Sequence, residues 1–199
     1  MGSFKLNTKE EKERKRKENV KPVTRMVLAG LFLALGIILP FFTGQIPMIG
    51  AMLLPMHIPV LLCGFICGWK YGLAVGLIVP LLRSAMFTMP PMFPQAVAMA
   101  VELGTYGFVS GWLYEHSKWQ CLKAIYRCLI AAMLAGRLVY GLVMALLMAS
   151  VGQPYSFTMF MTSAFASGIP GIIVQLLLIP SIMAVLNSQG ILRYRHIEA

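Results

Sequence analysis

Residues 122–150 read LKAIYRCLIAAMLAGRLVYGLVMALLMAS. Between Arg127 and the end of this stretch there is one charged residue, Arg137. About 20 mostly apolar residues suffice to cross the hydrocarbon core of a bilayer as an α-helix. The apolar residues do not alternate with polar ones, as they do in a barrel strand, so the stretch predicts a membrane-spanning helix.

Five further apolar runs accompany this stretch, at residues 25–42, 57–68, 71–87, 95–114 and 159–187. The chain of 199 residues is 58% hydrophobic and 12% charged, with a mean hydropathy of +0.76, whereas soluble domains are roughly 25% charged. We therefore expect an all-α integral membrane protein, a compact bundle of six transmembrane helices over residues 24–190. Glycines four residues apart, at 64–76 and 107–111, predict close approach of helix backbones.

The connections between the runs alternate in charge. Residues 43–56, 88–94 and 151–157 carry no charge, whereas the other connections and the C-terminal tail carry Lys70, Lys118, Lys123, Arg193 and Arg195. Basic residues mark the cytoplasmic side, so we expect both termini to be cytoplasmic in a multi-pass protein of a bacterial plasma membrane. The uncharged loops are rich in Pro, Gly and Met, which suits either a lid over a small ligand or tight turns near the headgroups.

Nine of the 17 basic residues lie between Lys5 and Arg25, together with four glutamates. Such a mixed, weakly hydrophobic run predicts a disordered basic cytoplasmic tail, residues 1–23, that lies in solvent or against anionic lipid. Residues 191–199 form a second, short cytoplasmic tail. The net charge of +10 is thus concentrated in a tail, and we expect no nucleic-acid partner.

Three charged residues lie well inside the apolar runs: Arg83, Glu102 and Arg137. A charge at the bilayer centre costs at least ~2.5–3.5 kcal/mol, so these residues are where function is expected. Counted at ~1.5 Å per residue from the outer end of each span, they lie roughly 6, 10 and 20 Å deep. His57 and Gln95 begin the second and fourth spans from the same side.

Two arginines beside one carboxylate would leave a positive charge unpaired. A carboxylate or phosphate on a ligand would neutralise that charge through a bidentate contact, which favours a binding site over simple pairing of Glu102 with one arginine. His57 would either contact the ligand or cap its helix. Gln175, in the middle of the sixth span, would contact either the ligand or a neighbouring helix.

Several catalytic and metal-binding signatures do not occur in the sequence. There is no phosphate-binding Gly-x-x-x-x-Gly-Lys-Ser/Thr loop, no Gly-x-Ser-x-Gly and no His-Glu-x-x-His. Cys63 and Cys67 are four residues apart without other soft ligands nearby, which favours helix packing over a metal site. We therefore expect neither an enzyme nor a bound cofactor or metal, and any ATP-driven step would need a partner.

Three stretches carry a family resemblance: VLAGLFLALG at 27–36, LPMHIPV at 54–60 and GWKYG at 68–72. Together with the six short spans and the basic tail, they resemble the substrate-binding S components of energy-coupling factor (ECF) vitamin transporters, and the chain looks similar to pantothenate-type members. The resemblance implies a subunit that captures a vitamin outside the cell. It would deliver the vitamin through a transmembrane coupling subunit and two cytoplasmic ATPases.

The resemblance also implies a docking face with small residues four apart on the first helix, at Gly30 and Ala34. The excess positive charge favours an acidic vitamin such as pantothenate, whereas a queuosine precursor or folate-like ligand would use Glu102 to accept ring N–H groups. A self-sufficient proton-coupled transporter with Glu102 as proton carrier is the alternative outside this family.

Overall fold

The computed structural model describes residues 22–44, 55–117, 121–153 and 169–189. These ranges form helices α2 (Pro22–Gly44), α4 (His57–Cys67), α5 (Trp69–Phe87), α6 (Val97–Glu115), α7 (Leu122–Ser150) and α9 (Ile169–Ser188), with a short helical segment η1 (Met92–Ala96) before α6. Within these ranges there is no strand, so the all-α prediction is confirmed for the described part of the chain. Residues 1–21 of the basic tail, the C-terminal tail and most of the first uncharged loop lie outside it, and the last two residues of the predicted basic tail belong to α2.

Among the described residues, five helices are long and apolar enough to cross a membrane: α2, α5, α6 with η1, α7 and α9. The predicted second span is α4, which has 11 residues and measures only ~16 Å. It therefore covers about half of the ~30 Å hydrocarbon core. The predicted sixth span is described only from Ile169 onward, because residues 159–168 lie outside the described ranges. The membrane-protein class is supported, whereas the count of six spans and the sidedness of the termini stay predictions.

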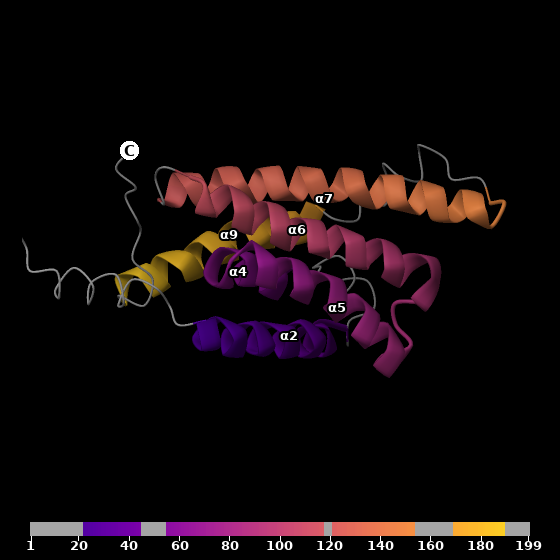
Figure 1. Ribbon diagram of the computed structural model, residues 1–199, viewed down its shortest axis with the longest axis horizontal. Helices are drawn as coiled ribbons and strands as arrows, with labels where there is room; N and C mark the ends of the chain where they lie inside the picture. The colour runs from indigo at the N-terminus through magenta and orange to yellow at the C-terminus, as the bar shows by residue number, and fades with distance from the viewer. Residues whose placement is uncertain (1–21, 45–54, 118–120, 154–168, 190–199) are drawn as a thin grey trace, which may run out of the picture.

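Helix α6 lies in the middle of the bundle, between α7 on one side and α4 and α5 on the other (Figure 1). Helix α2 packs against α4 and α5, and α9 packs against α4 and α7. The short helix α4 is almost entirely buried. It is thus a core element whose first residue, His57, lies in the interior of the protein.

Glycines hold α5 and α6 together at backbone distance. A Cβ added to Gly107 would meet the backbone of Gly72, and a Cβ added to Gly76 would meet the carbonyl of Leu103. The predicted close approach therefore occurs between these helices, as small residues allow in membrane bundles. Gly68 has a different role: at φ +100° it makes the one-residue turn between α4 and α5.

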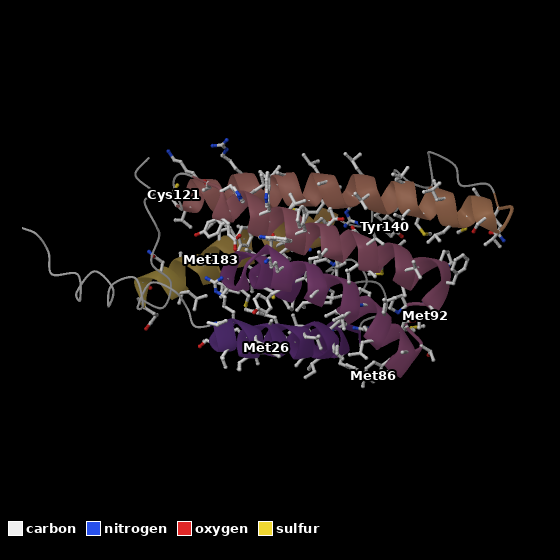
Figure 2. The ribbon with its side chains drawn as sticks, in the orientation of Figure 1. Met26, Met86, Met92, Cys121, Tyr140 and Met183 are labelled. Atoms are coloured by element: carbon white, nitrogen blue, oxygen red, sulfur yellow. The ribbon has the colours of Figure 1, made fainter. Side chains whose placement is uncertain are left out.

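The outer surface of the bundle is apolar. Met26, Met86 and Met92 are 69%, 59% and 48% exposed, whereas Tyr140 and Met183 point into the interior (Figure 2). A water-soluble domain avoids large contiguous apolar surface of this kind. The distribution fits a protein whose exterior contacts lipid tails and whose interior holds a small set of buried polar residues, among them His57, Glu102 and Arg137.

Candidate functional site

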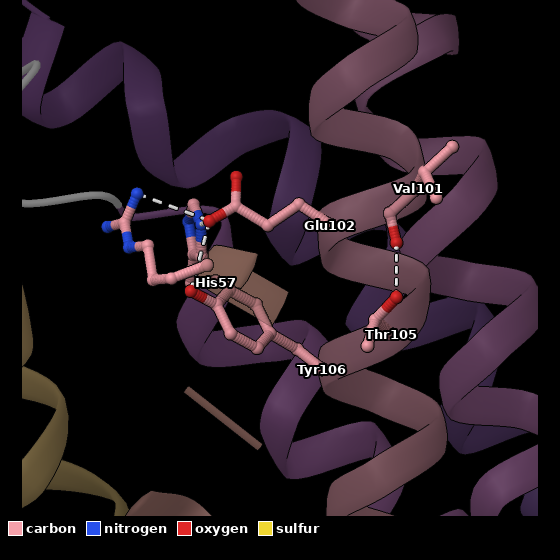
Figure 3. A network of polar contacts seen from close by, with 6 residues as sticks. His57, Val101, Glu102, Thr105 and Tyr106 are labelled. Atoms are coloured by element: carbon pink, nitrogen blue, oxygen red, sulfur yellow. Dashed lines mark hydrogen bonds and ion pairs between the residues drawn. The ribbon is translucent and has the colours of Figure 1, made fainter. Parts of the chain in front are cut away.

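A buried polar cluster joins α4, α6 and α7 in the interior. It consists of His57 at the start of α4, Glu102 and Tyr106 one turn apart on α6, and Arg137 in the middle of α7 (Figure 3). Each of the four residues is at most 8% exposed. Because residues four apart share one face of a helix, Glu102 and Tyr106 point toward the same neighbours.

One oxygen atom is the centre of this cluster. Oε1 of Glu102 accepts a hydrogen bond from the Tyr106 hydroxyl at 3.0 Å and lies 3.2 Å from Nη1 of Arg137. The His57 ring lies further away, with Nε2 3.9 Å from the same oxygen, too long for a hydrogen bond. Glu102 and Arg137 thus form a buried ion pair with His57 at its side.

The cluster contains buried nitrogen atoms without a hydrogen-bond partner among the described residues. They are Nε of Arg137 and both ring nitrogens of His57. Nε2 of Gln175 is a further one, on the helix α9 that packs against α4 and α7. Since an unpaired buried polar group costs about 1–3 kcal/mol, the three unpartnered nitrogens of Arg137 and His57 within the cluster point to a missing partner.

Most of these groups are hydrogen-bond donors. The guanidinium Nε and the amide Nε2 only donate, and a neutral imidazole has one N–H donor and one acceptor nitrogen. The complementary partner is therefore a group with acceptor oxygens, such as a carboxylate, a hydroxyl or an amide carbonyl. This arrangement can bind a small polar molecule, and it contains no activated nucleophile.

Arg83 does not join Glu102 in the described part of the chain. Its Nε donates to the carbonyl of Met89 at 3.2 Å, and its guanidinium carbon lies 5.9 Å from the centre of the Phe41 ring. It sits one turn before the end of α5, where it reaches the loop that follows the helix. The expected arrangement of two arginines around one carboxylate is therefore not found, and the buried pair is electrically balanced.

Gln95 also lies apart from the buried cluster. It is in η1, before α6 begins, and its side chain is exposed. Because α4 and α5 are antiparallel neighbours across Gly68, the end of α5 and the start of α4 lie at the same end of the bundle. Arg83 and Gln95 are thus at that end, above the cluster rather than in it.

Depth counted from span ends does not predict the pairing of Glu102 with Arg137. The count places Arg137 about 10 Å deeper than Glu102, yet the two side chains touch. Helix α7 extends past the start of α6 (Figure 1), so the ends from which the two depths were counted are not level. The offset between the two helices removes the difference in counted depth.

Two residues at the cluster were not predicted from the sequence. Tyr106 follows Glu102 by four residues, a spacing that would have identified it as a partner. Gly136 lies against the Tyr106 ring, since a Cβ added to it would meet that ring. Only the packing of α6 on α7 reveals this second contact.

The two residues expected at the docking face lie on the surface of α2. Gly30 and Ala34 are both exposed, and a Cβ added to Gly30 would meet no atom within 4 Å. The described part of the chain therefore leaves their common face uncovered. Among the described residues there is no group of three or more His, Cys, Asp or Glu side chains that would hold a metal ion.

Comparison with protein-family models matched residues 24–183 to the family "ECF transporter, substrate-specific component". Searches of curated proteins and of solved structures found no match. The family match covers all the described helices except the start of α2 and the end of α9. It agrees with the resemblance in the sequence and with a bundle of apolar helices. The chain belongs to the ECF transporter substrate-specific component family, whose members are transporter subunits and not enzymes.

Proposed function

We propose that this protein captures a small anionic micronutrient, with pantothenate as the leading example, for an ECF-type ABC importer. The observation that carries the proposal is the set of buried, unpartnered donors on Arg137, His57 and Gln175 within the described residues. A carboxylate with neighbouring hydroxyl or amide oxygens would satisfy these donors. Such a ligand would also hydrogen-bond the guanidinium edge that Glu102 leaves open.

The binding site in this proposal is reached from the end of the bundle where α4 begins. Arg83 and Gln95 are proposed to contact the ligand near that opening, and the uncharged residues 43–56 to close over it. We propose that this end faces outside the cell, because the basic residues Lys70 and Lys123 lie in the first turns of α5 and α7, at the opposite end of the bundle. The proposed order is then capture outside, closure of the loop and delivery inward.

Delivery would require partners, since the sequence contains no phosphate-binding loop of its own. We propose a transmembrane coupling subunit that docks on the face of α2 containing Gly30 and Ala34. Two cytoplasmic ATPases would drive it. The exposed, neighbour-free position of Gly30 supports this surface, because a flat stripe of small residues lets another helix approach closely.

Native mass spectrometry of the purified full-length protein tests the ligand assignment. A bound mass equal to that of pantothenate, which exchanges with added isotope-labelled pantothenate, is the expected result. A retained folate-like or deazapurine mass would instead support the ring-binding alternative, in which Glu102 accepts N–H groups. Pantothenate binding that is unchanged in Arg137→Gln would contradict the proposed site.

A further inference from the structure

Tyr106 contacts Glu102 and His57 directly, and it is connected to Arg137 through a single shared atom of Glu102. Its hydroxyl donates to Oε1 of Glu102, and its ring centre lies 5.2 Å from that of His57. The same Oε1 contacts Nη1 of Arg137. At 1% exposed, Tyr106 is among the largest fully buried side chains of the described residues.

The ring of Tyr106 is held from the side of α7 by a glycine. A Cβ added to Gly136 would lie 3.0 Å from Cζ of Tyr106 and closer still to Cδ1 and Cε1. Real Cβ atoms do not approach a ring carbon this closely, so any larger residue would force the ring to move. Movement away from α7 is limited by His57 and by the hydroxyl bond to Glu102.

The shared oxygen connects the position of Tyr106 to that of Arg137. A carboxylate that accepts hydrogen bonds from both sides has one orientation, and so does the guanidinium that it holds. If the Tyr106 hydroxyl were removed, Arg137 would be the one described residue with a polar atom within 3.5 Å of the Glu102 carboxylate. The carboxylate could then rotate, and the unpartnered Nε of Arg137 would no longer have a fixed direction.

We propose that Tyr106, seated against Gly136, is a positioning residue of the ligand site. It holds Glu102, and through Glu102 it aims Arg137 at the ligand. The inference rests on the proposed function, because it assumes that these donors bind an anionic ligand. It adds that α6 and α7 must pack closely at Gly136 for the ligand site to form. The positions of the charged residues alone do not show this requirement.

The test measures pantothenate binding to the detergent-purified full-length chain by equilibrium dialysis. We compare wild type with Tyr106→Phe, which keeps the ring and removes only the hydroxyl. Tyr114→Phe is the matched control, a buried tyrosine two turns further along α6. We expect roughly tenfold weaker binding for Tyr106→Phe, as for a lost hydrogen bond to a charged group, and unchanged binding for Tyr114→Phe.

Two further measurements separate positioning from a general structural role. Tyr106→Phe should still copurify with the coupling subunit and ATPases, and Gly136→Ala combined with Tyr106→Phe should lose less affinity than the product of the single effects. If Gly136→Ala does not fold, Tyr106→Phe alone decides. Binding by Tyr106→Phe within twofold of wild type overturns the inference, even if its melting temperature falls. If the wild-type protein does not bind pantothenate, the proposed ligand is wrong. This inference, which rests on that ligand, is then overturned as well.

Discussion

Replacing Glu102 by glutamine would test whether the buried ion pair has the energetic role that its geometry implies. The substitution keeps the size of the side chain, and the new amide oxygen could still accept from Tyr106, so the change removes little except the negative charge. Arg137 would then be left as a buried cation, at 8% exposed and without its counter-ion. Breaking one partner of a buried pair costs about 3–5 kcal/mol.

For a domain of 150–250 residues, each kcal/mol corresponds to a shift of about 2–4 °C in melting temperature. We therefore expect Glu102→Gln to lower the melting temperature by about 6–20 °C. A thiol-reactive fluorophore provides the assay, because Cys63, Cys67 and Cys128 are free and buried and become accessible on unfolding. The measurement uses the full-length chain in detergent.

Removal of both charges provides a second comparison in the same assay. Glu102→Gln combined with Arg137→Met leaves no buried charge in the pair, so most of the lost stability should return. Glu115→Gln is the matched control on the same helix. Its carboxylate is exposed, and we expect a shift below about 2 °C because exposed charges contribute little. A single Glu102→Gln variant as stable as wild type, or a double variant no more stable than the single, would refute the account.

Three other predictions concern the packing, the ligand and the docking face. Gly107→Ala should destabilise the protein by at least ~2 kcal/mol, because its Cβ would meet the backbone of α5. The control Gly30→Ala should leave thermal stability unchanged or slightly higher. Equal melting temperatures for the two variants would contradict this prediction. Gln175→Leu should keep or raise the melting temperature, since Nε2 of Gln175 has no partner among the described residues. The same variant should weaken pantothenate binding at least about tenfold. Unchanged binding would place Gln175 outside the site. Ala34→Leu should prevent copurification with the coupling subunit without loss of ligand binding. The control Ala74→Leu, on the exposed face of α5, should retain both. If Ala34→Leu loses ligand binding but still copurifies with the coupling subunit, Ala34 belongs to the ligand site and not to the docking face.

The pattern of apolar residues predicts the helices well. The expected fifth span and α7 have the same bounds, Leu122 to Ser150, and the expected third span differs from α5 only by two residues at its start. Hydropathy and helix breakers are local properties, so they can be read along the chain. They also predict a short second run, residues 57–68, which agrees with α4. They do not say that α4 is almost entirely buried by its neighbours, because that depends on how the other helices pack around it.

The candidate site shows which features the sequence predicts and which ones depend on the packing of the helices. Arg83, Glu102 and Arg137 could all be recognised as costly charges in apolar runs, and two of the three do meet. Which two meet depends on how far α7 extends past α6 and on how the helices are rotated. The turn of Arg83 toward Met89 likewise depends on the loop after α5. None of these quantities has a signature in a single stretch of sequence.

The order of amino acids is enough to predict a set of apolar helices with a few costly polar residues among them. That prediction follows from the free energy of placing each residue type in lipid, which is a property of the residue and its near neighbours. The packing of the helices was needed to show that Glu102 pairs with Arg137, that Tyr106 holds this pair and that Gly136 makes room for Tyr106. Most of these contacts join residues from different helices, and their formation depends on distances of a few ångströms that are set when the helices pack.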